Sequence, residues 1–207
     1  LEANPGTLEA GRFAEFRAAG INRLSIGVQS FADAQLSKLG RIHDSAQARR
    51  AIDSARAAGF DNFNLDIMHG LPDQSLNAAL SDLDAALSFE PPHLSWYQLT
   101  IEPNTVFYSK PPPLPSESIL TRVQDAGHDL LVSRGLAQYE VSAYARGDRL
   151  QSRHNLNYWQ FGDYLGIGAG AHGKISLLDG SQPLRTRKHR QPDHYLRAAS
   201  GRGNAGN

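Results

Sequence analysis

The first half of the chain alternates between two patterns of apolar residues. Apolar and polar residues alternate over 21–29 and 63–68, and a third strand is predicted over 93–101. The segments 44–58 and 75–87 carry apolar residues at helical spacing instead. Strands that alternate with helices in this way run parallel and are joined by right-handed crossovers. The predicted fold class is therefore α/β.

One face of each predicted strand is polar, which is unusual for a parallel sheet. The polar positions are Ser25, Gly27 and Gln29, then Asn64 and Asp66, then Gln98 and Thr100. A doubly wound sheet is covered on both faces, and a closed barrel fills its interior with branched apolar side chains. The pattern favours a partial, open parallel β/α barrel whose inner surface faces a polar ligand.

Four polar residues lie at or near the C-terminal ends of consecutive strands. They are Glu2, Gln29, Asp66 and Thr100. Each of them alone would be read as a solvated turn residue. Because ligands of α/β barrels bind at that rim, one such residue in every unit predicts a binding site there.

The proline-rich segment KPPPLP (110–115) can continue neither a helix nor a central strand. We therefore predict a barrel portion over 1–110 and a smaller α+β C-terminal domain over 116–207. Alternation over 138–145 predicts one strand in that domain, and HNLNYW (154–159) is predicted to follow as an exposed loop.

Two motifs of the second half allow opposed interpretations. His154 can bind iron through a neutral imidazole, with Tyr158 and Trp159 as flat apolar surface beside it, although a lone histidine is more often structural. The glycines of 166–173 alternate with Ile167 and Ala169. This favours a strand that a ligand or another backbone approaches closely over a dinucleotide-binding loop.

Composition excludes several classes of function. The 21 Lys and Arg balance 21 Asp and Glu, so no net positive field attracts nucleic acid. The chain contains no Cys and can supply neither a disulfide nor a thiolate ligand to an iron–sulfur cluster. No apolar run approaches the ~18 residues of a membrane span, and no signal peptide is recognised. The chain begins without Met, at what is predicted to be the end of a strand. We therefore expect it to be part of a longer protein.

Seven motifs in order resemble the radical S-adenosylmethionine proteins related to oxygen-independent coproporphyrinogen III oxidase. They are EANPG (2–6), NRLSIGVQSF (22–31), LGRIH (39–43), FNLDIMHGLPDQS (63–75), HLSWYQLTIEPNT (93–105), HNLNYW (154–159) and YLGIGAGAHGK (164–174). The resemblance is strongest to the branch regarded as heme chaperones, because HNLNYW is a hallmark of that branch.

This resemblance implies a partial barrel of the radical S-adenosylmethionine type with a 4Fe-4S cluster and S-adenosylmethionine at its C-terminal rim. Matched positions assign the S-adenosylmethionine contacts to Glu2, Gln29, Arg41, Asp66 and Thr100. They assign heme to His154, with Tyr158 and Trp159 beside it. The family's Cys-x-x-x-Cys-x-x-Cys loop is missing, so we expect a fragment without metal ligands, whose cluster-binding part lies upstream of Leu1.

The resemblance leaves two functions open. One is a cytoplasmic heme chaperone that delivers heme to acceptor proteins. In one version of this function the acceptor is a respiratory protein, and the chaperone is located peripherally at the membrane. The other is an enzyme that decarboxylates coproporphyrinogen III oxidatively by radical chemistry. HNLNYW favours the chaperone, and the fragment by itself is expected to be inactive.

Overall fold

The structure is a computed structural model that describes residues 1–6, 12–177, 180 and 182–200. The chain divides into two compact units, Leu1–Gln151 and Ser152–Asn207. The predicted boundary at 110–115 thus differs from the division between these units, because that segment lies inside the first one.

The first unit is built on a six-stranded sheet in the order β1-β2-β3-β4-β6-β5. Four neighbouring strands are parallel, and they are β1 (Glu2–Ala3), β2 (Leu24–Gln29), β3 (Phe63–His69) and β4 (His93–Gln98). The predicted α/β class with parallel strands is therefore confirmed. The third predicted strand is shorter than expected, since β4 ends at Gln98 and not near Ile101.

The single strand predicted over 138–145 is wrong, because the chain forms a hairpin there. Strands β5 (Ala137–Glu140) and β6 (Ala143–Ala145) pair antiparallel across a turn at 141–142, and β6 pairs with β4. The turn residues are Val141 and Ser142, so the reversal lacks the Gly, Pro or Asn that usually marks a tight turn in a sequence. The hairpin extends the sheet of the first unit beyond residue 116.

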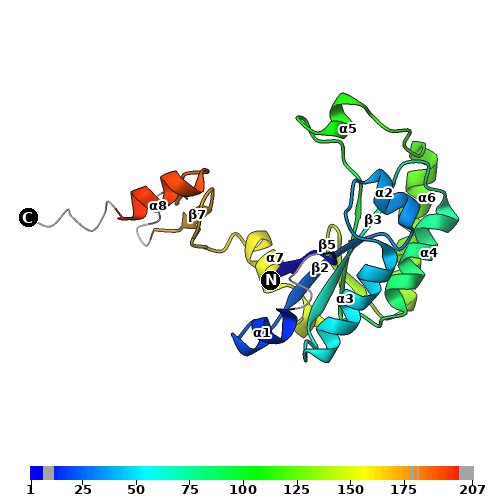
Figure 1. The fold of residues 1–207 in the computed structure, drawn as a ribbon, viewed down its shortest axis with the longest axis horizontal. Helices are drawn as coiled ribbons and strands as arrows, with labels where there is room; N and C mark the ends of the chain where they lie inside the picture. Colours follow the sequence, from blue (N-terminus) through cyan, green and yellow to red (C-terminus); the bar gives the residue numbers. More distant parts are fainter. Residues whose placement is uncertain (7–11, 178–179, 181, 201–207) are drawn as a thin grey trace, which may run out of the picture. The chain divides into compact units, whose positions relative to one another are not determined.

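Helices line one face of this sheet (Figure 1). The long ones are α3 (Ser45–Ala57), α4 (Leu76–Leu87) and α6 (Glu117–Ser133). Shorter helices are α1 (Phe13–Ala18), α2 (Asp33–Lys38) and α5 (Val106–Ser109), and α5 projects away from the sheet. A 3-10 turn, Asp148–Leu150, ends the unit. Helix α3 begins where Asp44 and Gln47 form a capping box, and α4 begins where the Ser75 hydroxyl accepts a bond from the Ala78 amide.

The core lies between the helices and alternate residues of the strands. The buried strand residues of this core are Ala3, Leu24, Ile26, Val28, Phe63, Leu65, Ile67, Leu94, Trp96 and Tyr144. Trp96 packs against α6 at Gly127, where a Cβ atom would lie 1.8 Å from Cη2 of the indole ring. Glycine at this position therefore permits the close packing of α6 on β4.

The second unit contains helix α7 (Arg153–Trp159), strands β7 (His172–Ile175) and β8 (Leu184–Arg187), and helix α8 (Pro192–Ser200). Strands β7 and β8 pair antiparallel. The loop predicted for 154–159 is wrong, because these residues lie in α7. Ser152 caps this helix and accepts a hydrogen bond from the Asn155 amide, 3.4 Å away.

The glycine-rich segment of this unit brings two backbone segments together. A Cβ on Gly166 would lie 2.2 Å from the carbonyl oxygen of His172. This confirms the predicted close approach, although the strand itself begins only at His172. Among the residues that the structure describes, no helix has both the length and the apolar run that crossing a membrane requires.

Candidate functional site

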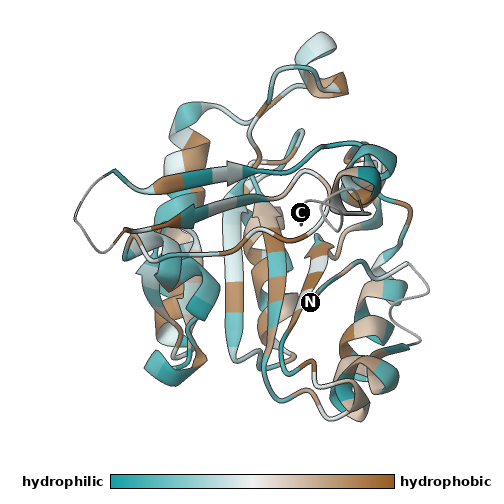
Figure 2. Cartoon of the chain, turned by 90° about the vertical axis from the view of Figure 1, so that its left-hand side faces the viewer, coloured by the Kyte–Doolittle hydropathy of each residue, from teal (hydrophilic) through white to brown (hydrophobic). Residues whose placement is uncertain are grey.

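The sheet face that points away from the helices carries polar side chains. In-register pairing places Glu2 beside Ser25, Ser25 beside Asn64, and Asn64 beside His93. Asp66 and Ser95 form the next row. Figure 2 shows the hydropathy of the strands changing along their length, as expected for strands with one apolar and one polar face. The polar face predicted for the first two strands is confirmed, and we call it the polar face below.

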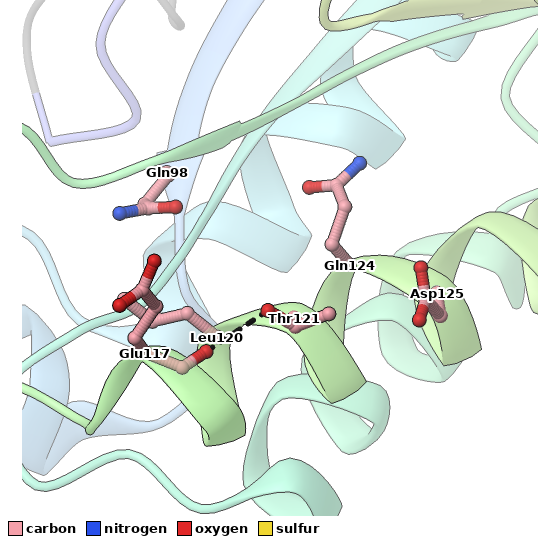
Figure 3. Close-up of a pocket in the computed structure, with 6 residues that line it drawn as sticks. All are labelled: Gln98, Glu117, Leu120, Thr121, Gln124 and Asp125. Atoms are coloured by element: carbon pink, nitrogen blue, oxygen red, sulfur yellow. Dashed lines mark hydrogen bonds between the residues drawn. The ribbon is translucent and has the colours of Figure 1, made fainter.

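The prediction for the third strand was out of phase by one residue. Because Leu94 and Trp96 are buried against the helices, Gln98 also points to the helix side. There it lines a pocket with residues of α6 (Figure 3), namely Glu117, Leu120, Thr121, Gln124 and Asp125. The residues of β4 on the polar face are His93, Ser95 and Tyr97. A shift of one residue moves every side chain of a strand to the opposite face.

A continuous hydrogen-bond network crosses the polar face, and Asn64 is its centre. The Asn64 amide nitrogen donates to Ser25 Oγ (2.7 Å) and to Asp66 Oδ1 (2.8 Å). Its carbonyl oxygen lies 2.7 Å from His93 Nδ1 and accepts a bond from Ser95 Oγ at 3.1 Å. Since an amide oxygen only accepts, His93 carries its proton on Nδ1. His93 Nε2, 2.7 Å from the Tyr139 hydroxyl, is then the acceptor of the tyrosine proton.

The network assigns a donor and an acceptor to each of these hydrogen bonds. Tyr139 donates to His93, His93 donates to Asn64, and Asn64 donates to Asp66. Ser25 also donates to Asp66, at 3.0 Å. Burial raises the pKa of Asp66, the hydrogen bonds from Ser25, Asn64 and Ser95 lower it, and the negative charge of Glu2 raises it further. Asp66 is therefore the terminal acceptor of the network.

Gln29 lies on the same face as Asp66, as predicted, and its backbone is strained. Its φ of 70° is a left-handed conformation that non-glycine residues rarely adopt. The side chain extends over Gly27, where a Cβ would lie 3.0 Å from Gln29 Nε2. Its oxygen accepts a short bond, 2.6 Å, from the Tyr97 hydroxyl. Backbone strain of this kind is concentrated at ligand sites.

Two buried side chains hold the loops around Gln29. Asp82 of α4 accepts bonds from the Ser30 hydroxyl and the Phe31 amide, both 2.7 Å long. Burial raises the pKa of Asp82, and these two bonds lower it. His43 Nε2 lies 3.1 Å from the Val28 carbonyl oxygen and fixes the segment that carries Arg41 against the end of β2.

Four of the five residues predicted to contact S-adenosylmethionine lie on the polar face or close enough to act on it electrostatically. Glu2 and Arg41 are exposed there, and each acts electrostatically on a residue of that face. Burial raises the pKa of Tyr97 to about 12, the charge of Asp66 raises it too, and the positive charge of Arg41 and the Gln29 bond lower it. Thr100 differs from the other four. It lies beyond the end of β4, is exposed, and donates to Glu102 at 3.3 Å.

Four further side chains of this face were not predicted from the sequence, and they are His93, Ser95, Tyr97 and Tyr139. His93, Ser95 and Tyr97 occupy every second position of β4, so an alternation that starts at His93 would have predicted their shared face. Tyr139 carried no signal, because it reaches the network only through the pairing of the hairpin with β4.

The residues predicted to contact heme lie together on α7. His154 and Tyr158 stand one helical turn apart with ring centroids 4.9 Å from each other, and Tyr158 lies 4.9 Å from the Tyr164 ring. His154 is exposed, and so are Tyr158 (47%) and Trp159 (55%). The helix thus presents an imidazole and two aromatic rings to its surroundings.

The residues present do not fit an iron–sulfur cluster, since the chain contains no Cys. Within the described ranges, no three His, Asp or Glu side chains are grouped so that they could hold a metal ion.

Comparison with known proteins shows which proteins this chain resembles. Residues 1–85 match the radical SAM superfamily model. Proteins called heme chaperone HemW are similar over most of this chain. That of Escherichia coli (strain K12) is 57% identical over 95% of this chain and 51% of its own length. That of Bacillus subtilis (strain 168) is 40% identical over 84% of this chain and 47% of its own length. The chain thus spans about half the length of these curated relatives.

A solved structure shows the same fold. The coproporphyrinogen III oxidase (HemN) of Escherichia coli matches with a TM-score of 0.77 over 99% of this chain and 49% of its own. Its identity of 23% supports a shared fold and nothing finer. The mostly parallel sheet with helices on one face is thus the radical SAM fold that the sequence predicted. In its sequence this chain resembles radical SAM proteins, among them the proteins called heme chaperone HemW, and it shares the fold of one solved radical SAM enzyme.

Proposed function

We propose that this chain is part of a protein that binds heme and transfers it to acceptor proteins. The supporting observation is its 57% identity, over 95% of the chain, to a relative called heme chaperone HemW. The alternative function, that of a coproporphyrinogen oxidase, is supported only by the similarity of fold. A cytoplasmic location and a respiratory acceptor at the membrane are further parts of this proposal.

Helix α7 supplies the chemistry that heme binding requires. The imidazole of His154 can donate a nitrogen lone pair to iron, and its exposure leaves room for a macrocycle. Tyr158 stands edge-on to His154 with an interplanar angle of 67°. Tyr158 and Trp159 would add apolar contact area and would not ligate the iron.

Replacing His154 with alanine tests this proposal. We expect the Soret band of hemin bound to the chain to shift or vanish, because the iron loses its nitrogen ligand. The melting temperature should change little, since an exposed side chain at this place buries almost no area. Absorbance titration with hemin and a thermal melt measure the two effects.

His194→Ala is the matched control, because His194 is an exposed histidine on another helix of the same unit. It should leave the hemin spectrum unchanged. A His154→Ala variant with an unaltered Soret band and a lowered melting temperature would show that His154 only anchors α7.

We further propose that the polar face contacts S-adenosylmethionine in the complete protein. The donor and acceptor set fits this ligand. Glu2, Gln29 and Asp66 offer oxygens to the ribose hydroxyls and the ammonium group, and Arg41 offers a guanidinium to the carboxylate. Thr100 is included as the outermost contact.

This chain by itself should bind S-adenosylmethionine weakly, because it has no cysteine and so no cluster to chelate the methionine part. At millimolar ligand we expect amide NMR shifts at Gln29, Asp66 and Tyr97. Asp66→Asn should reduce these shifts, because it removes the terminal anionic acceptor.

Glu117→Gln is the control, since Glu117 lines the pocket on the helix side of the sheet. It should leave the shifts unchanged. Tight binding in calorimetry would contradict the expected weakness. Shifts confined to the α6 pocket would contradict the assignment to the polar face.

A further inference from the structure

Phe161 has a backbone conformation that aromatic residues rarely adopt. It follows α7 directly and has a φ of 55°. The Phe161 amide donates to the Tyr158 carbonyl (3.0 Å), and the Gly162 amide donates to the Asn157 carbonyl (2.7 Å). This pair of bonds is a Schellman motif, in which the left-handed position is normally glycine. Here that position holds a phenylalanine.

The strained conformation is held firmly by its surroundings. Lys174 Nζ donates to the Phe161 carbonyl oxygen at 2.7 Å and to Asp163 Oδ1 at 3.0 Å. The glycine of this turn is displaced to position 162, where a Cβ would lie 2.1 Å from Asn157 Oδ1. The turn therefore fixes the direction of the Phe161 side chain.

Folding gains little from the Phe161 ring, which is 83% exposed. A large aromatic side chain that is both strained and exposed reduces stability without burying apolar area. Such a residue is best explained by a ligand that covers it. The neighbouring aromatic side chains Tyr158 and Trp159 belong to the last turn of α7 and are half exposed as well.

The charge of the second unit indicates what kind of ligand this is. Residues 152–207 contain eight Lys and Arg against three Asp, although the whole chain is neutral. A positive unit that presents aromatic rings complements a ligand with a flat apolar body and negative groups. Heme, with its macrocycle and two carboxylates, has this character.

We propose that Phe161 is a further heme-contacting residue, which the left-handed turn after α7 holds in place to pack on the macrocycle. This inference rests on the proposed heme-binding function. It adds to His154, Tyr158 and Trp159 a contact that the sequence motif did not include.

The Phe161→Gly variant distinguishes a binding role from a structural one. A structural role predicts a lower melting temperature, whereas a binding role does not. Glycine is the preferred residue at this φ, so the melting temperature should rise or stay the same. Loss of the ring should weaken hemin binding roughly tenfold. Phe161→Tyr keeps the ring and should retain the affinity of the unchanged chain.

Hemin titration of the 207-residue chain and its variants distinguishes the outcomes. Equal hemin affinity of Phe161→Gly and the unchanged chain would overturn this inference and leave the proposed function standing. An unchanged chain that binds no hemin would overturn both. Sedimentation with vesicles of phosphatidylglycerol and phosphatidylcholine provides a further comparison. If Phe161→Gly weakens vesicle binding and not hemin binding, the ring contacts lipid and the inference is wrong.

Discussion

A Gly127→Ala variant is expected to lose about 3 kcal/mol of unfolding free energy, the largest effect of any single methyl group added to the described core. The new Cβ would lie 1.8, 2.4 and 2.5 Å from three carbon atoms of the Trp96 ring. This ring is buried, at 2% exposure, and is too rigid to move aside without displacing its neighbours. Helix α6 must therefore move away from β4. Urea denaturation followed by circular dichroism measures the loss.

Gly40→Ala is the matched control. Gly40 has a φ of 67°, and no atom lies within 4 Å of the place that a Cβ would occupy, so alanine there meets only backbone strain. We expect a loss of about 1 kcal/mol. Trp96→Phe should recover part of the Gly127→Ala loss in the double variant, because the smaller ring leaves space. Equal losses for the two glycine variants would show that α6 does not pack on Trp96 as described.

Lowering the pH from 7 to 4.5 is expected to destabilise the first unit through two buried neutral histidines. Burial lowers the pKa of His93 to about 3, and the charge of Arg23 lowers it too. Burial lowers the pKa of His69 to about 4, partly offset by a hydrogen bond to Gln124. In the unfolded chain both take up a proton near pH 6.5. The contribution of these two histidines to stability is thus fully present above pH 6.5. It is lost as the pH falls towards their pKa values in the folded protein.

The size of this effect follows from the difference in pKa. At pH 4.5 each histidine contributes a loss of about 2 to 3 kcal/mol. Protonation of His93 would also break the network, because Nε2 could no longer accept the Tyr139 proton. Urea denaturation at a series of pH values measures the change.

A His93→Gln variant should be less stable at pH 7 and yet lose less stability on acidification. Asp66 and Asp82 act in the opposite direction, since a raised pKa favours the protonated folded state in acid. Both proteins contain these carboxyls, so the comparison isolates His93. His194→Gln, at an exposed position, is the control. Equal slopes for His93→Gln and the unchanged chain would contradict a neutral His93 in the network.

Much of the first unit could be predicted from its sequence, because the governing interactions are local. Helical spacing and capping residues locate α3 and α4, and alternation locates β2 and β3. The same alternation places Gln29 and Asp66 on one face, since side chains of a strand alternate strictly. The ordered motifs also indicate the resemblance to radical SAM proteins, which composition and periodicity cannot do.

The tertiary structure decided what depends on pairing between distant segments. The phase of β4 follows from its register with β3, which turns Tyr97 to the polar face and Gln98 to the helices. The hairpin that brings Tyr139 to His93 exists because β6 pairs with β4. Neither contact leaves a local pattern in the sequence.

Backbone conformation at single residues was likewise decided by tertiary contacts. Nothing in the residue types at Gln29 or Phe161 predicts a left-handed φ, since both side chains disfavour it. Asp82 fixes the turn that follows Gln29, and Lys174 fixes the carbonyl of Phe161. The sequence by itself determined the fold class, the resemblance to radical SAM proteins and one polar face. Only long-range contacts determined which side chains meet there, because their energies depend on groups far apart in the chain.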